Sequence, residues 1–435
     1  MNKSILRLAV PNIISNITVP ILGMVDIALM GHLESAVYIG AIGLGSVIFN
    51  VLYLSLGFLR MGTTGFTAQA YGKSDNAEIA HGLYRAFGVA FVLALLLIMF
   101  QLPIEKLSFY LLNGSEEVKS LAREYFYIRI YAAPATLGIF VLMGWLVGLQ
   151  NTVLPMILSI AINVLNIGFN LYFVQVLKMD VAGVALGTVL SQYGGMVLGI
   201  FIVIRKYGHK LQPLKMEVLL QVEQLSRFFK VNRDILIRSV LLILTLSFFT
   251  SESAGMGDQI LAVNSMMLQY FFVFSYFMDG FAYAGEALIG KHIGKNDKKM
   301  LSLTVKKLLM WGLILSLPFM LFYGLAHQSL FRLITDNDSL IQLAERYRLW
   351  LILIPITTFS AFIWDGIYIG ATASVSMRNT MLIASLIVFF PCWYFLQPLY
   401  FNHGLWIAFH AFMLSRGVLM TLFSSKALAF KWFRV

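Results

Sequence analysis

The stretch Val19-Pro-Ile-Leu-Gly-Met-Val-Asp-Ile-Ala-Leu-Met-Gly-His32 closes the first long apolar run of the chain and contains a single acid, Asp26. No basic residue lies near enough in sequence to neutralise this carboxylate. A lone carboxylate at membrane depth costs about 2.5 to 3.5 kcal/mol, so such acids face cavities and bind protons, cations or cationic ligands. We therefore predict that Asp26 carries ion-binding chemistry. The alternative is a structural hydrogen bond to a neighbouring helix.

The composition of the chain supplies the membrane that this interpretation needs. Of 435 residues, 59% are hydrophobic and 12% are charged, and the mean hydropathy is +0.80. A water-soluble globule could not cover so much apolar surface. Runs long enough to cross about 30 Å of hydrocarbon recur along the chain. We predict an all-α integral membrane protein with twelve transmembrane helices near 5–32, 37–71, 84–103, 121–149, 154–177, 181–204, 236–257, 260–290, 304–327, 342–370, 379–400 and 404–428.

The net charge of +11 reflects topology rather than a nucleic-acid partner. If the amino terminus is cytoplasmic, most basic residues fall in the cytoplasmic segments, above all in 205–238 and 291–307. Basic residues on the opposite side are largely balanced by acids. This asymmetry follows the positive-inside rule and predicts that both termini are cytoplasmic. We expect anionic lipid headgroups as partners and no nucleic acid.

The sequence is also doubled, because three short motifs recur at an offset of 222 residues. The pairs are Gly72-Lys-Ser-Asp75 with Gly294-Lys-Asn-Asp297, Leu121-Ala-Arg-Glu-Tyr125 with Leu343-Ala-Glu-Arg-Tyr347, and Tyr172-Phe-Val-Gln175 with Tyr394-Phe-Leu-Gln397. Each half holds six spans, an even number, so the repeats are parallel and related by an axis along the membrane normal. We predict two pseudo-symmetric six-helix bundles, an amino-terminal lobe at 1–204 and a carboxy-terminal lobe at 235–435, joined by a cytoplasmic linker at 205–234.

Two packed six-helix lobes are typical of secondary transporters, in which a cleft opens alternately to each side of the membrane. The sequence contains no GxxxxGK[ST] phosphate-binding loop. Its seven histidines are scattered, without an HExxH pair or an array of paired carboxylates. We therefore predict neither an enzyme nor a resident metal site, and the single cysteine, Cys392, excludes an intramolecular disulfide.

Four segments together resemble the multidrug and toxic compound extrusion (MATE) family, and the last resembles its DinF branch. They are Gly23-Met-Val-Asp-Ile-Ala-Leu-Met-Gly31, Asn163-Val-Leu-Asn-Ile-Gly-Phe-Asn170, Asp180-Val-Ala-Gly-Val-Ala-Leu-Gly-Thr188 and Asp279-Gly-Phe-Ala-Tyr-Ala-Gly-Glu-Ala-Leu-Ile-Gly290. The resemblance implies a V-shaped pair of lobes around a central cavity. It also implies export of amphipathic, often cationic, organic compounds in exchange for protons or sodium ions. We expect a monomer in the bacterial cytoplasmic (inner) membrane.

The family's coupling site maps onto this chain with one departure. The resemblance assigns its aspartate, asparagine and threonine to Asp26, Asn166 and Thr188, whereas many relatives have a second aspartate where this chain has Asn170. Asn166 and Asn170 lie one helical turn apart on one face, where both can offer amide oxygens to Asp26. A sodium ion could still bind at Asp26, Asn166, Asn170 and Thr188. The missing carboxylate weakens cation binding, so we favour protons as the coupling ion.

Asn163 completes this set of candidate coupling residues, since it shares the run with Asn166 and Asn170. All three asparagines could instead be interhelical hydrogen-bonding residues. At the repeat offset their positions are held by Ser385, Val388 and Cys392, so the fold itself does not require three asparagines. This comparison makes the amino-terminal lobe the better candidate for the coupling site.

Three acids of the second lobe are candidates for the substrate cavity or for coupling. Asp365 lies where some relatives also keep an aspartate, and we predict that it contacts a cationic substrate or aids coupling. Asp279 and Glu286 are two turns apart on one helical face, and they could equally hold helices together or pair with lysines near Lys291.

Pro11 and Pro20 fall inside the first predicted helix, where each removes a backbone donor and favours a kink. We predict that they act as hinges when Asp26 is protonated.

Three alternatives to an antiporter remain open. A lipid or polysaccharide-precursor flippase of the same superfamily would carry a more basic cavity. A channel would conduct without a coupling gradient, and a membrane-embedded enzyme would show turnover without vesicles.

Overall fold

The structure is a computed structural model that describes residues 1–31, 36–213 and 221–428, without the side chains of 19, 21–31 and 36. Helices dominate these ranges, and no strand occurs in them. Eleven of the described helical segments are long and apolar enough to cross a membrane. The first predicted span, 5–32, coincides with a helix whose side chains are only partly described. The prediction of an all-α integral membrane protein is confirmed.

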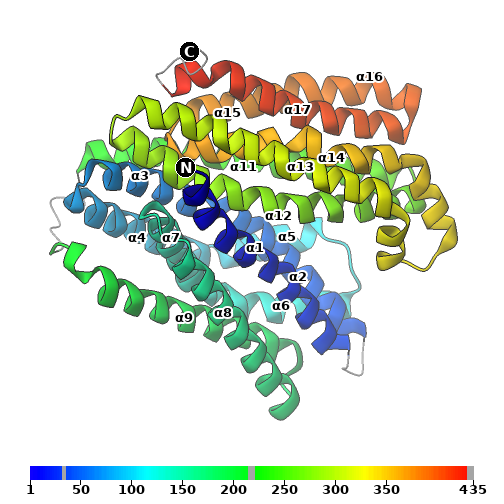
Figure 1. Ribbon diagram of the computed structural model, residues 1–435. Coiled ribbons are helices and arrows are strands. Elements are labelled where there is room, and N and C mark those ends of the chain that lie inside the picture. Colours follow the sequence, from blue (N-terminus) through cyan, green and yellow to red (C-terminus); the bar gives the residue numbers. More distant parts are fainter. Residues whose placement is uncertain (32–35, 214–220, 429–435) are drawn as a thin grey trace. The chain divides into compact units, whose positions relative to one another are not determined.

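The first half of the chain runs from α1 to η3 (Figure 1). Its helices are α1 (Asn2–Gly31), α2 (Ala36–Leu56), α3 (Phe58–Lys73), α4 (Asn76–Met99), α5 (Gln101–Leu111), α6 (Glu116–Arg129), η1 (Ile130–Ala132), α7 (Ala133–Gly148), α8 (Val153–Leu171), η2 (Tyr172–Val176), α9 (Asp180–Tyr207) and η3 (Gly208–Lys210).

The second half runs from α11 to α17. Its helices are α11 (Val222–Gly255), α12 (Asp258–Gly294), α13 (Lys298–Ile334), α14 (Asp338–Gly370), α15 (Ser374–Leu382), η4 (Ile383–Phe389), α16 (Phe390–Tyr400) and α17 (Asn402–Ala427). Part of the predicted linker, from Val222 onward, therefore belongs to a helix.

The repeat of 222 residues is visible in where helices begin. The starts of α2, α4, α6 and α9 correspond at this offset to the starts of α12, α13, α14 and α17. Equivalent residues also cap equivalent helices. Asp75 accepts a hydrogen bond from the backbone N–H of Glu78 at 2.9 Å, and Asp297 accepts one from Met300 at 3.0 Å. A side-chain acceptor at this position satisfies an otherwise unpaired backbone donor, so the same sequence signal starts both helices.

The same helix crossing is built twice with glycine. A Cβ atom added to Gly144 of α7 would collide with the carbonyl oxygen of Arg60 in α3. A Cβ atom added to Gly366 of α14 would collide with the carbonyl oxygen of Ala282 in α12. Both glycines and both carbonyl positions are 222 residues apart. Close approach of two helix backbones requires glycine here, as in many membrane bundles.

The repeats differ in the second span of each half. In the first half this span is interrupted at Gly57, between α2 and α3. In the second half α12 runs without interruption, and Asp279 occupies the position equivalent to Gly57. An acid has therefore replaced a helix break in one copy of the repeat.

The chain forms two compact units. One consists of Met1–Ile13 with Lys230–Val435, and the other is Ile14–Phe229. Two helices pass from one unit to the other, α1 after Ile13 and α11 after Phe229. The lobes predicted at 1–204 and 235–435, with a linker at 205–234, stay a prediction, and the compact units have different limits.

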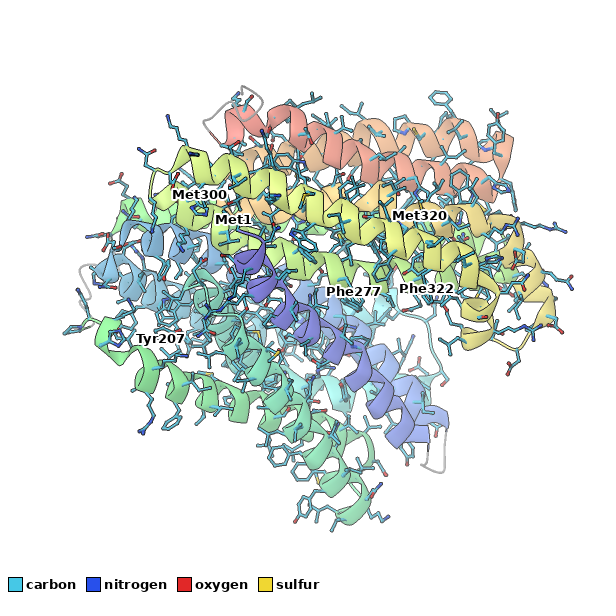
Figure 2. The ribbon with its side chains drawn as sticks, viewed as in Figure 1. Met1, Tyr207, Phe277, Met300, Met320 and Phe322 are labelled. Carbon is cyan, nitrogen blue, oxygen red and sulfur yellow. The ribbon has the colours of Figure 1, made fainter. Side chains whose placement is uncertain are left out.

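The beginning of α1 packs within the unit of the carboxy-terminal half. Thr304 of α13 donates a hydrogen bond to the sulfur of Met1 at 3.6 Å, and Figure 2 shows Met1 beside this helix, near Met300. A Cβ atom on Gly280 of α12 would collide with the side chain of Ile13.

Each unit has its own apolar core. Phe49, Tyr125 and Phe126 pack in the unit that contains α2 and α6. Phe249 and Trp406 stack edge to face in the other unit, with ring centroids 4.9 Å apart. Cores of large aromatic side chains fix the helices whose inner faces carry the polar residues described below.

Candidate functional site

Amide side chains on one face of α8 form the centre of the candidate site. Asn163, Asn166 and Asn170 follow each other at helical spacing, and Asn166 and Asn170 are buried. Polar side chains on a buried helix face must find hydrogen-bond partners on neighbouring helices. The three asparagines do so on two sides, toward α1 and toward α9.

Toward α9, the amides form a continuous hydrogen-bonded chain. Asn170 Nδ2 donates to Asn166 Oδ1 at 3.1 Å, and Asn166 Nδ2 donates to Thr188 Oγ1 at 3.2 Å. Asn166 Nδ2 also lies 3.4 Å from Ser191 Oγ. Thr188 Oγ1 in turn donates to the carbonyl oxygen of Val184 at 3.0 Å. The structure therefore brings three predicted site residues together in one network.

Gly187 makes room for this network. A Cβ atom at Gly187 would collide with Oδ1 of Asn170, so the backbone of α9 approaches the amide closely. Sequence analysis singled out Thr188 and missed the glycine directly before it. The signal was present in the motif Leu186-Gly-Thr188.

Toward α1, Ser159 and Asn163 connect α8 to the first helix. Ser15 Oγ donates to Ser159 Oγ at 2.8 Å, and Asn163 Nδ2 donates to the carbonyl oxygen of Thr18 at 3.4 Å. Asn163 is thus separate from the chain that joins Asn166, Asn170 and Thr188, and its observed bond ties two helices together.

Asp26 belongs to α1, but its side chain lies outside the part of the molecule that the structure describes. Pro11 and Pro20 both lie within α1, and Pro11 is two residues before the point where the chain passes from one compact unit to the other. The roles predicted for these three residues remain predictions.

In the carboxy-terminal half, Asp365 is held by two arginines. Arg238 Nη1 of α11 and Arg416 Nη2 of α17 each lie 2.7 Å from Oδ2 of Asp365 in α14. All three residues are buried. Sequence analysis named Asp365 but assigned Arg238 to the cytoplasmic basic stretch and did not single out Arg416. The available signal was that Arg416 stands alone in the apolar run 404–428.

Asp279 and Glu286 lie on α12, two turns apart, as their spacing predicted. Glu286 is buried with 1% of its surface exposed, and Asp279 is partly buried. The charge of Asp279 acts on Arg416. Asp279 is therefore near the arginines that hold Asp365.

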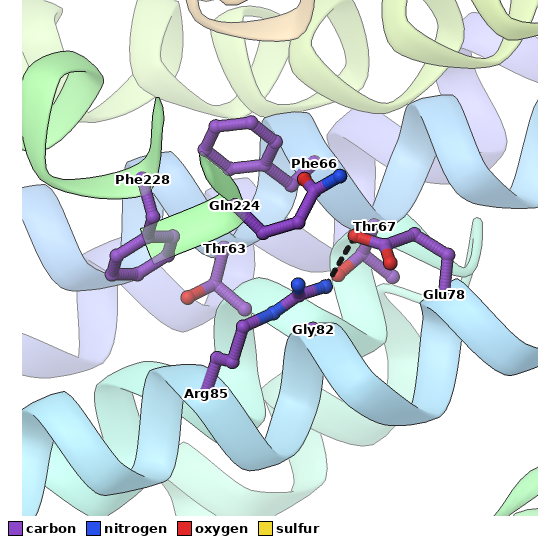
Figure 3. Close-up of a pocket in the computed structure, with 8 residues that line it drawn as sticks. All are labelled: Thr63, Phe66, Thr67, Glu78, Gly82, Arg85, Gln224 and Phe228. Atoms are coloured by element: carbon purple, nitrogen blue, oxygen red, sulfur yellow. Dashed lines mark hydrogen bonds and ion pairs between the residues drawn. The ribbon is translucent and has the colours of Figure 1, made fainter. Parts of the chain in front are cut away.

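A small pocket of about 20 Å³ lies elsewhere, between α3, α4 and the start of α11 (Figure 3). It is lined by Thr63, Phe66, Thr67, Glu78, Gly82, Arg85, Gln224 and Phe228. Arg85 pairs with Glu78, while Arg85 Nη1 and Thr63 Oγ1 have no hydrogen-bond partner among the described residues. A space of this size holds about one water molecule. It is too small for an organic substrate.

Among the described residues, no group of three or more His, Cys, Asp or Glu side chains is close enough to hold a metal ion.

The chain matches the MatE family model over residues 11–172 and 235–394. It is 37% identical to DNA damage-inducible protein F of Escherichia coli, across 96% of this chain and 90% of that protein. It is 23% identical to the probable multidrug resistance protein NorM of Thermotoga maritima, across 97% of this chain and 92% of the relative.

Solved structures of MATE transporters share its fold. The Vibrio cholerae transporter VcmN in its bent form matches with a TM-score of 0.86 at 17% identity, over 98% of this chain and 97% of that one. An outward-facing multidrug resistance MATE transporter matches with a TM-score of 0.83 at 18% identity, over 98% of this chain and 96% of that one. These matches confirm the predicted two-lobed transporter fold. The chain therefore belongs to the MatE family, as its motifs indicated, and is a multi-pass membrane transporter rather than an enzyme.

Proposed function

We propose that the protein is a secondary active antiporter that exports amphipathic, often cationic, organic compounds in exchange for protons. It would work in the bacterial cytoplasmic membrane, with both termini in the cytoplasm, by alternating access between two repeats. Family membership supports a transporter, and the names of its relatives include multidrug resistance proteins. The coupling ion and the substrates are the part that we propose.

The observation that carries the coupling proposal is the register between α1 and α8. Ser15 pairs with Ser159 and Thr18 with Asn163, so residue numbers rise in the same direction along both helices. Continued by about two turns of 3.6 residues, this register brings the level of Asp26 on α1 to that of Asn170 on α8. We therefore propose that Asp26 works against the amide chain of Asn166 and Asn170.

The hydrogen bonds of this chain favour protons over sodium. A sodium ion needs several oxygen atoms that are free to coordinate it. Asn166 Oδ1 already accepts from Asn170, and Thr188 Oγ1 already accepts from Asn166. Asn170 also provides no negative charge at the position where many relatives have an aspartate. A proton on Asp26 needs no such set of ligands.

We propose that protonation of Asp26 changes the bonding between α1 and α8 and that α1 bends at Pro11 and Pro20. Both prolines remove a backbone hydrogen bond from the helix, which lowers the cost of bending. Pro11 is well placed for this role because the two compact units divide between Ile13 and Ile14.

The test is dye export by protein reconstituted in vesicles, with proton and sodium gradients imposed separately. We expect a proton gradient alone to drive export by the wild type, and Asp26→Asn to abolish it. Glu116→Gln is the control, since this acid is exposed at the start of α6. Unchanged export by Asp26→Asn would remove Asp26 from the mechanism, and export driven by sodium alone would overturn the choice of ion.

The same vesicles separate the alternatives. Ionic current in the absence of a gradient would identify a channel. Movement of a labelled lipid-linked precursor between leaflets, without dye export, would identify a flippase.

A further inference from the structure

The buried cluster of Arg238, Asp365 and Arg416 is the strongest concentration of charge that sequence analysis did not anticipate. It joins three helices of one compact unit, α11, α14 and α17. Only 5% of the Arg238 side chain and 1% of the Arg416 side chain are exposed. Long basic side chains near helix ends usually extend to water, and these two do not.

The fold itself does not require this cluster. At the repeat offset of 222, its three positions correspond to Asn16, Met143 and Gly194, none of which carries a charge. The first copy of the six-helix repeat therefore forms without ionised groups at these places. Charges inside membrane bundles are costly and are kept where they serve ion or substrate pathways.

The cluster is also incompletely paired. Both arginines contact the same oxygen of Asp365, Oδ2. The other oxygen, Oδ1, and the Nε of Arg416 are buried and have no hydrogen-bond partner in the described part of the chain. Buried polar atoms without partners are rare, and each one suggests a ligand or an ordered water.

Asp234 of the same unit shows what a complete ion pair looks like. Its Oδ1 accepts from Arg378 Nη1 at 2.8 Å, and its Oδ2 accepts from Ser374 Oγ at 3.0 Å. Both oxygens are satisfied, as expected for an ion pair that only ties helices together.

The two unpaired atoms have opposite requirements. Asp365 Oδ1 needs a donor, and Arg416 Nε needs an acceptor. Asp279 adds a second negative charge that acts on Arg416, which offsets the second guanidinium. A ligand without net charge, with a cationic donor at one end and an acidic acceptor at the other, fits both atoms and leaves this charge balance unchanged.

We propose that Arg238, Asp365 and Arg416 form a recognition site for zwitterionic amphipathic compounds. The acidic group of the compound binds Arg416, and its cationic group binds Asp365. Arg238 holds Asp365 in place from the other side. This inference rests on the proposed function, because it assigns a class of compound to the exporter.

The experiment measures binding of two dyes to the purified protein by fluorescence polarisation. One is a rhodamine with a free carboxylate, which is zwitterionic, and the other is its methyl ester, which keeps the dye core and only the positive charge. We expect the wild type to bind the zwitterion at least about tenfold more tightly than the ester.

The main variant is the double substitution Asp365→Asn with Arg416→Gln, which removes one charge of each sign and leaves no buried charge unpaired. We expect it to lose the tenfold preference and to bind the ester as the wild type does. The control is Asp234→Asn with Arg378→Gln, which neutralises the complete ion pair in the same unit. It should keep the preference.

Three results would overturn the proposal. They are a wild type that does not prefer the zwitterion, a double variant that keeps the preference, and a control pair that loses it equally. Thermal unfolding of each variant identifies a general loss of structure, and Arg416→Lys, which keeps the charge, then serves as the second variant with a weakened preference expected. Because binding needs no gradient, failed proton-driven export would contradict the proposed coupling and leave this result standing.

Discussion

Asn170 donates a hydrogen bond to the side-chain oxygen of Asn166, one turn earlier on the same helix. Asn166 passes its own N–H on to Thr188. The two amides therefore have a fixed direction, with donors pointing along the chain toward α9. A carboxylate at position 170 would reverse this arrangement, because it accepts and cannot donate.

The first prediction follows from this direction. Asn170→Asp places two acceptors side by side and adds a negative charge, so Asn166 Oδ1 and the new carboxylate both become available to a cation. We expect export to gain dependence on a sodium gradient, measured in reconstituted vesicles. Asn163→Asp is the matched control, since it adds the same charge to the same helix where the amide bonds to Thr18. Equal sodium dependence in both variants would contradict the assignment.

The second prediction concerns Gly187. Gly187→Ala introduces a Cβ that collides with Asn170, so α8 and α9 must separate or the amide chain must break. We expect a loss of stability of about 1–3 kcal/mol, which is typical of overpacking. Thermal unfolding of the purified protein measures it. Gly168→Ala on α8 is the control because a Cβ there meets no atom within 4 Å. Similar melting temperatures for both variants would show that the close contact is not needed.

The third prediction tests the repeated helix crossing. Gly144→Ala and Gly366→Ala should each destabilise the protein, since the added Cβ meets a backbone carbonyl that cannot move aside like a side chain. We expect at least about 1–3 kcal/mol for each. The losses should add in the double variant, because distant sites act independently. Gly82→Ala, where space is open, should change little.

The fourth prediction concerns the start of α11. Phe228 is buried and lies 5.7 Å, centroid to centroid, from Phe66 of α3. Phe228→Ala should release this end of α11 from α3 and make the preceding segment easier to cleave. Limited proteolysis between α9 and α11 measures the effect. Phe229→Ala is a neighbouring control, since 52% of that side chain is exposed. Equal cleavage of the two variants would show that Phe228 does not hold the helix.

Much of the fold could be predicted because its signals are local or periodic. Apolar runs predicted the helices within a few residues of their ends, and the offset of 222 predicted which helices share a cap, as Asp75 and Asp297 do. The interruption at Gly57 was not predicted, because one glycine in an apolar run does not reveal whether a helix continues.

The candidate site was predicted unevenly for a related reason. Asn166, Asn170 and Thr188 form one network, as the family resemblance led us to expect. The pairing of Asp365 with Arg238 and Arg416 was missed, because the partners are 127 and 51 residues away in sequence. Charge counting assigned Arg238 to a loop, and only packing of three helices shows that it points inward.

The two copies of the repeat have divided their polar chemistry, with neutral amides in one and ionised groups in the other. A substitution in the charged copy can then change which compounds are accepted while leaving the amide copy intact. The reverse also holds. Gene duplication has thus given this protein two separately adjustable parts, so new cargo specificity can evolve without a new energy source.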